Sequence, residues 1–309
     1  MNELHTPVLA EEAAHWLAIR PGGTYVDATV GLGGHALAFL RRMNGAGRLV
    51  GLDRDAQAIE IARERLKEFE RQVTLVHANF SSIDEVLTRL GIGPADGVLA
   101  DLGVSSMQLD SMARGFSFRS SGPLDMRMDQ RNDQSLPAQA NLAEITASES
   151  VNGAAERELA DLLYRYGEEH DSRRIARAIV RARPIRDAGH LATVVAGARK
   201  HGGRQRLHPA TKTFLALRIA VNREMEELEQ FLSRTPATLS PGGRWAVLSY
   251  HSLEDRQVKR RFQQLAREAA FRLLTKKVIQ PTEAEIAANP RARSAKMRVA
   301  EKIAAESMS

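Results

Sequence analysis

The chain has 309 residues, which is long for one domain, so we expect a core domain with an insertion or a second domain. It contains no cysteine, which excludes disulfides, thiolate metal sites and cysteine nucleophiles. Its 44 Lys and Arg against 38 Asp and Glu give a net charge of +6, which favours a polyanionic partner, although plain solubility would also account for it.

The basic charge is concentrated in one stretch. Residues 171–212 contain 11 Lys and Arg against two Asp and Glu, an excess that is larger than the net charge of the entire chain. No apolar run approaches the roughly 20 residues needed to span a bilayer, and the first residues lack a basic region followed by a hydrophobic stretch. We therefore expect a cytoplasmic protein.

The first hundred residues alternate short β-rich runs with helical patterns. This alternation is typical of a parallel sheet built from βαβ units. The strands are predicted at 24–28, 48–53, 73–77 and 96–101, and the helices between them at 34–43, 55–68 and 81–90. Ser82 and Glu85 form a capping-box pattern at the start of the third helix.

The alternation stops after Asp101, and residues 115–129 show no sustained period. The elements predicted beyond this point are helices within about 141–200 and strands at 244–250, 271–279 and 296–302. We predict an α/β protein whose doubly wound sheet is interrupted once. Its sheet domain would comprise residues 1–109 and 208–309, and an inserted helical domain would comprise residues 110–207.

A glycine-rich segment, Gly31-Leu-Gly33-Gly34-His35-Ala36, lies between the first predicted strand and the first predicted helix. Here the absence of side chains lets the backbone approach a ligand and exposes the amides of a helix N-terminus. The segment satisfies the dinucleotide fingerprint G-x-G-x-x-G/A, with Asp53 about 20 residues further on to bind ribose hydroxyls. A tight turn without a ligand is the alternative.

Asp27 favours a cationic cofactor over a dinucleotide. A carboxylate that ends the first strand would repel a pyrophosphate, whereas S-adenosylmethionine carries a positive sulfonium and an ammonium and has no phosphate. The alternative is that Asp27 caps the following turn. The ligands of such a sheet bind in the crevice beyond the carboxyl ends of its strands, where the loops after neighbouring strands meet.

Two further residues at this edge have a binding and a structural interpretation. Asp53 can accept hydrogen bonds from both ribose hydroxyls, or it can cap the next helix, a role that Asp55 could fill instead. Phe80 follows the third strand, and its ring could lie against an adenine face or make a core contact. The binding interpretation of Phe80 depends on the other residues of this edge.

Asp101 and His251 are the candidate catalytic residues. Asp101 ends the fourth strand, where it could accept hydrogen bonds from the exocyclic amine of cytosine or adenine, or contact the amino group of the cofactor. His251 ends the next strand of the sheet and could orient the base or relay its proton. A single histidine at a strand end is also often structural.

A basic helix is predicted within the insertion. Arg173, Arg177 and Arg181 recur at every fourth position and form a stripe beside an apolar face of Ile175, Ile179 and Val180. Because like charges at this spacing repel, the stripe is expected to face the phosphates of a partner rather than water. A solvated helix face is the alternative.

Several ordered motifs extend over nearly the full length of the chain. In the first half they are His5-Thr-Pro-Val-Leu9, Asp27-Ala-Thr-Val-Gly-Leu-Gly-Gly-His35, Leu52-Asp-Arg-Asp55, Asp101-Leu-Gly-Val-Ser-Ser106, Gln108-Leu-Asp110, Arg114-Gly-Phe-Ser-Phe118 and Gly122-Pro-Leu-Asp-Met-Arg-Met-Asp129. In the second half they are Tyr166-Gly-Glu-Glu169, His208-Pro-Ala-Thr211, Ser252-Leu-Glu-Asp-Arg256 and Asn289-Pro-Arg-Ala-Arg-Ser294. In these motifs the chain resembles the bacterial small-subunit ribosomal RNA cytosine-N4 methyltransferases, the RsmH or MraW group.

The resemblance implies a Rossmann-like class I S-adenosylmethionine-dependent methyltransferase sheet with an inserted substrate-recognition domain. It also implies methyl transfer from S-adenosylmethionine to the N4 amine of a cytosine in the decoding region of 16S ribosomal RNA, so the partner would be this RNA or the small ribosomal subunit. The implied cofactor-binding residues are Gly33, Gly34, His35, Asp53, Phe80, Asp101 and Gln108, of which Gln108 is indicated by the resemblance alone. No metal site is assigned.

Two departures from broader patterns bear on the site. Most S-adenosylmethionine enzymes of this fold have a glycine where Thr29 stands. Many amino-methyltransferases carry Pro-Pro-aromatic after the fourth-strand acid, whereas this chain has Leu102-Gly103-Val104, which leaves the aromatic that holds the base unidentified.

Two other functions are weighed against the methyltransferase. A non-catalytic RNA-binding ribosome assembly factor with a retained cofactor pocket is the first, and a nicotinamide-dependent oxidoreductase is the second. The intact acids and glycines argue against the assembly factor, and Asp27 together with the basic insertion argues against the oxidoreductase.

Overall fold

The computed structural model describes residues 7–118, 122–130, 145–199 and 208–304, which belong to two compact units. The sheet unit contains the chain up to Gly103 and again from Met225, and the helical unit contains Val104–Glu224. These borders differ from those expected at 110 and 207. The segment 208–224 belongs to the helical unit because its helix buries apolar side chains such as Phe214 and Leu217 in that unit's core.

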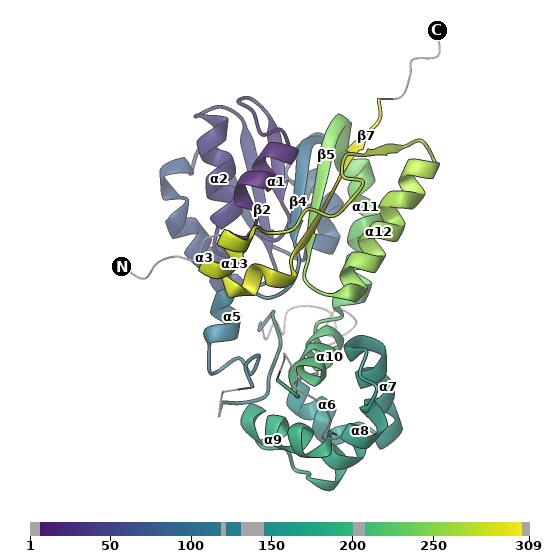
Figure 1. Cartoon of the computed structure of the whole chain (residues 1–309). Coiled ribbons are helices and arrows are strands. Elements are labelled where there is room, and N and C mark those ends of the chain that lie inside the picture. The colour runs from purple at the N-terminus through teal and green to yellow at the C-terminus, as the bar shows by residue number, and fades with distance from the viewer. Residues whose placement is uncertain (1–6, 119–121, 131–144, 200–207, 305–309) are drawn as a thin grey trace. The chain divides into compact units, whose positions relative to one another are not determined.

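The sheet unit is built around seven strands in the order β3-β2-β1-β4-β5-β7-β6 (Figure 1). Their bounds are β1 Thr24–Asp27, β2 Arg48–Asp53, β3 Val73–His77, β4 Ala95–Asp101, β5 Leu239–Ser249, β6 Phe271–Leu273 and β7 Lys296–Lys302. The first five strands pair in parallel, and β7 runs antiparallel to β5 and β6. This is a Rossmann-like, doubly wound α/β sheet, as the sequence predicted.

Helices cover both faces of the sheet (Figure 1). The helices of the sheet unit are α1 Ala10–Trp16, α2 Gly34–Met43, α3 Ala56–Arg65, α4 Ile83–Arg89, α11 Glu224–Thr238, α12 Ser252–Arg267 and α13 Glu283–Ala288. Side chains from α1, α2 and α3 share one core with Tyr25 and Leu49, whereas α4, α11 and α12 share another with Val26 and Val50. Because alternate strand residues point to opposite faces, successive residues of β1 and β2 belong to different cores.

Three details of the sheet unit differ from the sequence-based predictions. Strand β5 begins at Leu239 rather than at residue 244. Ser82 does not form a capping box, because a turn of 3-10 helix, Phe80–Ser82, precedes α4 and the Ser82 hydroxyl donates to the Asn79 carbonyl over 2.8 Å. Strand β6 ends at Leu273 rather than near residue 279. There the amides of Leu274 and Thr275 both donate to the carbonyl of Val299, so two residues oppose one and the pairing is interrupted.

The helical unit contains α5 Ser106–Asp110, α6 Ala147–Gly153, α7 Glu156–Gly167, α8 Ser172–Arg181, α9 Ala188–Ala198 and α10 Thr211–Val221. The helices predicted within 141–200 are confirmed, although residues 141–144 and 200 lie outside the described part of the chain. None of the helices that the structure describes is long and apolar enough to cross a membrane.

Two irregular segments, residues 114–118 and 122–128, are held by buried polar side chains. The Arg114 guanidinium donates to the carbonyls of Arg127 and Met128 over 3.1 and 2.9 Å. Asn222 directly follows α10, and its side-chain Nδ2 donates to the backbone carbonyl of Met126 over 2.7 Å. Its side-chain Oδ1 accepts from the backbone amide of Met128 over 2.8 Å. These bonds replace the backbone ladder that a helix or strand would supply.

Candidate active site

Three carboxylates stand at the same edge of the sheet. Asp27 ends β1, Asp53 ends β2 and Asp101 ends β4. Since β2, β1 and β4 are neighbouring parallel strands, their carboxyl ends lie side by side. The structure thus brings together the three acids that the sequence analysis assigned to a ligand crevice.

The glycine-rich loop connects β1 to α2 through left-handed backbone conformations. Gly33 precedes α2 with a φ of +77°, and a Cβ atom there would lie 3.3 Å from the side chain of Leu66. A Cβ atom on Gly34 would lie 3.1 Å from the ring of Pro7. Packing within the protein therefore also requires these two glycines, beside any approach of a ligand to the backbone.

Asp53 fixes the glycine-rich loop. Its two carboxylate oxygens accept hydrogen bonds from the backbone amides of Gly31 and Asp55, each over 2.8 Å. Asp55 caps α3 by accepting from the Gln57 amide, so it fills the capping role that the sequence analysis weighed for Asp53 or Asp55. Each carboxylate oxygen has a second lone pair, so Asp53 can still accept a ribose hydroxyl. Burial raises the pKa of Asp53 to about 6 against the effect of both backbone hydrogen bonds.

Asp27 is fully buried and only half satisfied. Its Oδ1 accepts from the Thr29 amide over 3.3 Å, so the predicted alternative role as a turn cap holds for this oxygen. Its Oδ2 accepts no hydrogen bond from any residue that the structure describes. Burial, together with the charges of Asp101 and Asp53, raises the pKa of Asp27 to about 7, although His35 and the Thr29 amide act in the opposite direction. At this edge of the sheet the negative charges of Asp53 and Asp101 act on Asp27, which has one carboxylate oxygen without a hydrogen-bond donor among the described residues.

Asp101 lies between two side-chain donors. The hydroxyl of Tyr250 donates to Oδ1 over 2.8 Å, and Oδ2 lies 3.3 Å from Nε2 of His35. The Asp101 backbone amide donates to Oγ1 of Thr29 over 2.6 Å. Thr29, which departs from the glycine usual in this fold, therefore anchors the residue that carries the candidate catalytic carboxylate.

The two donors of Asp101 differ in charge. Burial alone would lower the pKa of His35, but the hydrogen bond and charge of Asp101, with the charge of Asp27, raise it above its ordinary value, so the imidazolium is favoured. Burial and the charge of Asp101 raise the pKa of Tyr250 well above its ordinary value. The phenol consequently stays protonated and donates throughout the neutral range.

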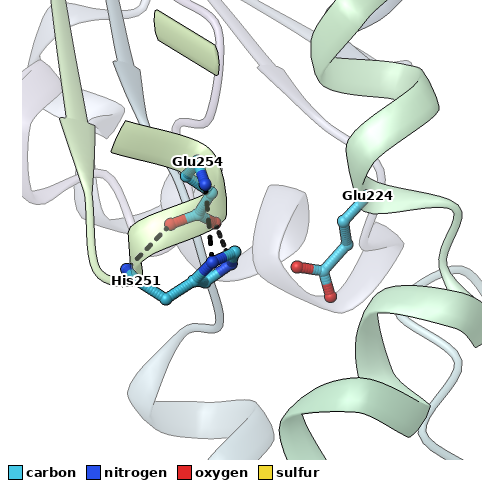
Figure 2. A group of neighbouring side chains, drawn as sticks. All are labelled: Glu224, His251 and Glu254. Atoms are coloured by element: carbon cyan, nitrogen blue, oxygen red, sulfur yellow. Dashed lines mark hydrogen bonds and ion pairs between the residues drawn. The ribbon is translucent and has the colours of Figure 1, made fainter. Parts of the chain in front are cut away.

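His251 caps α12, and within the described part of the chain no hydrogen bond or ion pair joins it to Asp27, Asp53 or Asp101. Its Nδ1 accepts from the Glu254 amide over 3.5 Å, and its Nε2 lies 3.1 Å from Oε1 of Glu254 (Figure 2). Oε2 of Glu254 accepts from the amides of Tyr250 and His251 over 2.9 and 3.3 Å. The hydrogen bond of Nδ1 and the closeness of Nε2 to the Glu254 carboxylate place the imidazole within the cap, which favours the structural alternative for His251.

Phe80 has one edge in the core of the sheet unit. Its ring meets that of Phe231 edge to face, with the centroids 5.2 Å apart. Phe231 in turn packs on Trp245, and both are fully buried. Phe80 itself is partly exposed, so the core contact does not cover the whole ring, and the adenine contact stays a prediction.

Gln108 belongs to the helical unit, whereas the other residues of the predicted cofactor site belong to the sheet unit. It is buried and forms a capping box at the start of α5 with Ser105. Its Oε1 accepts from the Ser105 amide over 3.1 Å, and its own amide donates to the Ser105 hydroxyl over 3.2 Å. The cap orients the amide of Gln108, and its role toward a cofactor stays a prediction.

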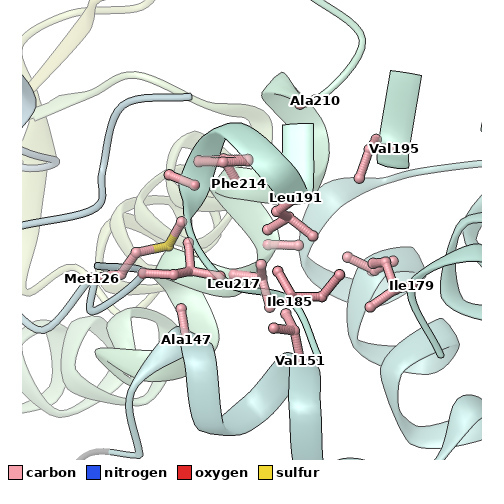
Figure 3. Close-up of a cluster of buried hydrophobic side chains, with 14 of the residues drawn as sticks. Met126, Ala147, Val151, Ile179, Ile185, Leu191, Val195, Ala210, Phe214 and Leu217 are labelled. Atoms are coloured by element: carbon pink, nitrogen blue, oxygen red, sulfur yellow. The ribbon is translucent and has the colours of Figure 1, made fainter. Parts of the chain in front are cut away.

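The predicted arginine stripe lies on the surface of the helical unit. Arg173, Arg177 and Arg181 are exposed on α8, while Ile175 and Ile179 on its other face are buried in the core of the unit (Figure 3). Arg177 makes an exposed ion pair with Glu156 over 3.3 Å, which adds little stability in water. The stripe is therefore available to phosphates, although one of its members has a competing carboxylate.

Tyr250 is the residue at this edge whose contact the sequence analysis missed. It directly follows β5, which lies beside β4, so the ends of these parallel strands are neighbours. The sequence indicated this contact only through an aromatic residue at the end of a buried strand. To predict the contact, one would have had to know that β5 lies beside β4 in the sheet in spite of the insertion between them.

Comparisons with known proteins agree with these motifs. The model of the MraW methylase family matches residues 2–303. The Ribosomal RNA small subunit methyltransferase H of Koribacter versatilis is 50% identical over 305 residues, 96% of this chain and 93% of that protein. The protein of the same name in Gloeobacter violaceus is 50% identical over 303 residues, 98% of this chain and 90% of that protein. A solved rRNA methylase from Streptococcus thermophilus has 10% identity and a TM-score of 0.46, and covers 97% of this chain and 99% of its own.

Proposed function

Since this chain belongs to the MraW methylase family, we propose that it transfers a methyl group from S-adenosylmethionine to the N4 amine of a cytosine in the decoding region of small-subunit ribosomal RNA. The names of its relatives support ribosomal RNA of the small subunit as the substrate. The observation that carries the proposal is the fixed carboxylate of Asp101, held between Tyr250 and His35 at the edge where ligands of such sheets bind.

The residues at the sheet edge fit a cationic methyl donor. Asp27, Asp53 and Asp101 act on one another electrostatically, and the buried Oδ2 of Asp27 accepts no hydrogen bond within the described part of the chain. When bound, S-adenosylmethionine supplies an electrophilic methyl group on a positively charged sulfur. Its charges would offset the excess of carboxylates, whereas the phosphates of a dinucleotide would add to it.

Asp101 is expected to act on the amine that receives the methyl group. With the cofactor bound, the N4 lone pair would form the bond to the methyl carbon, the electron pair of the carbon–sulfur bond would stay on sulfur, and the nitrogen would release one proton to water. By accepting a hydrogen bond from an amine N–H, Asp101 stabilises the positive charge that develops on the nitrogen. The absence of cysteine agrees with direct transfer, because methylation at C5 of cytosine normally needs a thiolate.

The helical unit is proposed to recognise the RNA. Arg173, Arg177 and Arg181 extend from one exposed face of α8 at a spacing at which like charges repel each other, and the exposed ion pair of Arg177 with Glu156 offsets this only in part. Phosphates along an RNA backbone would relieve this repulsion and release counterions on binding.

The experiment that tests the function uses purified protein, methyl-labelled S-adenosylmethionine and small ribosomal subunits that lack their normal methylation. We expect label on N4 of one cytosine after digestion to nucleosides and mass spectrometry. Label on another atom would contradict the N4 assignment. No label on subunits or on free RNA, with binding of the cofactor verified, would favour the assembly factor instead.

A further inference from the structure

Tyr250, the last residue of the strand predicted at 244–250, is joined to Asp101 by a hydrogen bond that no sequence motif indicated. The sheet brings the two together, because Leu248 near the end of β5 pairs with Asp101 at the end of β4. The Leu102 amide then donates to the Leu248 carbonyl over 3.1 Å, which extends the pairing beyond Asp101. The phenol hydroxyl consequently reaches Oδ1 of the carboxylate over 2.8 Å.

Both ends of Tyr250 are fixed in place. Its backbone amide donates to Oε2 of Glu254, a buried residue in the first turn of α12, over 2.9 Å. Its ring faces Gly103, where a Cβ atom would lie 3.4 Å from a ring carbon. The φ of Gly103 is +112°, a conformation that side chains rarely adopt, so this glycine lets the backbone after Asp101 pass close to the ring. The hydroxyl therefore has little freedom to leave the carboxylate.

The chemistry of a phenol suits this position. A carboxylate that assists an amine must keep its charge and a constant orientation while the amine nitrogen becomes positive. Nε2 of His35 already lies beside Oδ2 of Asp101, and the carboxylate raises the pKa of this imidazole. Tyr250 adds a second donor without adding another positive charge, and lone pairs remain on both oxygens for the amine.

We propose that Tyr250 is the positioning residue for Asp101, which it holds in the orientation that accepts the target amine. The proposal rests on the proposed function. At this edge an aromatic ring directly follows β5, and Gly103 leaves room for it, whereas the segment after the fourth-strand acid carries none.

The test compares two tyrosine-to-phenylalanine variants of the full chain. Tyr250→Phe keeps the ring against Gly103 and removes the hydroxyl. Tyr25→Phe is the matched control, because the Tyr25 hydroxyl also makes hydrogen bonds inside the sheet unit, to the Ala18 carbonyl over 3.2 Å and from the Arg20 amide over 3.0 Å. Thermal unfolding of both variants measures the purely structural loss.

In Tyr250→Phe we expect kcat to fall roughly tenfold or more, with the KM values for S-adenosylmethionine and RNA within about twofold of wild type. The acid limb of the pH–rate profile is expected to move to higher pH, because a carboxylate that has lost a donor binds its proton more tightly. Tyr25→Phe is expected to leave kcat and this limb unchanged. In an Asp101→Asn background, Tyr250→Phe is expected to have little further effect on single-turnover rates.

The outcomes separate the two proposals. Wild-type protein that methylates N4 while Tyr250→Phe retains its kcat and pH profile would overturn only the role of Tyr250. The same role is overturned if the two phenylalanine variants lose activity in step with their thermal stability and neither shifts the pH profile. Wild-type protein that transfers no methyl group would defeat the proposed function, and the role of Tyr250 with it.

Discussion

The hydroxyl of Thr29 accepts a hydrogen bond from the backbone amide of Asp101 over 2.6 Å. This bond ties the loop after β1 to the last residue of β4. A glycine, usual at this position in the fold, has no atom that could accept it. The loop that leads into α2 thus also holds the backbone of the candidate catalytic residue.

Thr29→Val is expected to destabilise the protein, because it keeps the shape of the side chain but leaves the Asp101 amide without its acceptor. The expected loss in free energy of unfolding is about 1–3 kcal/mol, measured by urea denaturation. Thr29→Ser is the matched control, since it keeps the hydroxyl. Equal stability of the Val and Ser variants would show that the bond contributes nothing.

Asp27→Asn is expected to stabilise the cofactor-free protein at alkaline pH. The pKa of Asp27 is about 7 in the folded protein against an ordinary value of 3.8. Because the folded state binds the proton more tightly, the stability this group contributes is complete below about pH 4 and is lost as the pH rises through about 7. Asparagine carries no charge, so the difference in Tm between variant and wild type should grow from pH 5 to pH 8. A constant difference would contradict the assignment.

The same substitution is expected to weaken S-adenosylmethionine binding. Removing the Asp27 charge reduces the negative field that would attract the cation, while Asp53, Asp101 and His35 stay in place. Wild-type affinity, measured by calorimetric titration, is expected to rise from pH 6 to pH 8 as Asp27 ionises, and the variant should show a flatter dependence. Equal affinities at pH 8 would exclude Asp27 from cofactor binding.

Asp101→Asn is expected to lower kcat roughly 100-fold to 1000-fold, because the neutral amide stabilises the developing charge on N4 poorly. The control is Asp96→Asn in the same strand. Asp96 accepts from Arg20 and from the Thr24 amide, each over 2.8 Å, at the other end of β4, so its loss should affect stability alone. Near-normal transfer by Asp101→Asn or Asp101→Ala would remove Asp101 from the mechanism.

The arginine stripe predicts a steep dependence of RNA affinity on salt. Neutralising Arg173, Arg177 and Arg181 to Gln should lower the slope of log K against log salt by roughly 0.7 to 1 for each residue that contacts a phosphate. Arg267→Gln, at an exposed position on α12 of the sheet unit, serves as the control. If the slope stays the same in the triple variant, the stripe is a solvated helix face.

His251→Asn distinguishes the two interpretations of His251. Asparagine is a favourable N-cap, so the variant should keep α12 capped, whereas His251→Ala should cost about 1 kcal/mol of stability. If the cap is the whole role, kcat of His251→Asn stays within about threefold of wild type. A much larger loss of kcat at normal stability would restore the predicted catalytic role.

Strand positions could be predicted where a buried apolar run is bounded by charged or turn residues, as in β2 and β4. Local patterns failed where a tertiary contact decides the outcome. Ser82, expected to begin a capping box, lies at the end of a 3-10 turn instead. Helix α10 packs in the helical unit, although it comes after residue 207, where that unit was expected to end. The contact between Asp101 and Tyr250 was unpredictable for the same reason, because it is set by the pairing of β4 with β5.

The bond between Tyr250 and Asp101 joins residues 149 positions apart in the chain. Loop-closure entropy grows only with the logarithm of loop length, so the long insertion between β4 and β5 costs the equilibrium little. The insertion instead affects the order in which the parts of the site are synthesised. A chain that has emerged from the ribosome only as far as the helical unit already contains the carboxylate of Asp101 but not yet the phenol that orients it. The finished arrangement of this pair must wait until the last third of the protein has been made.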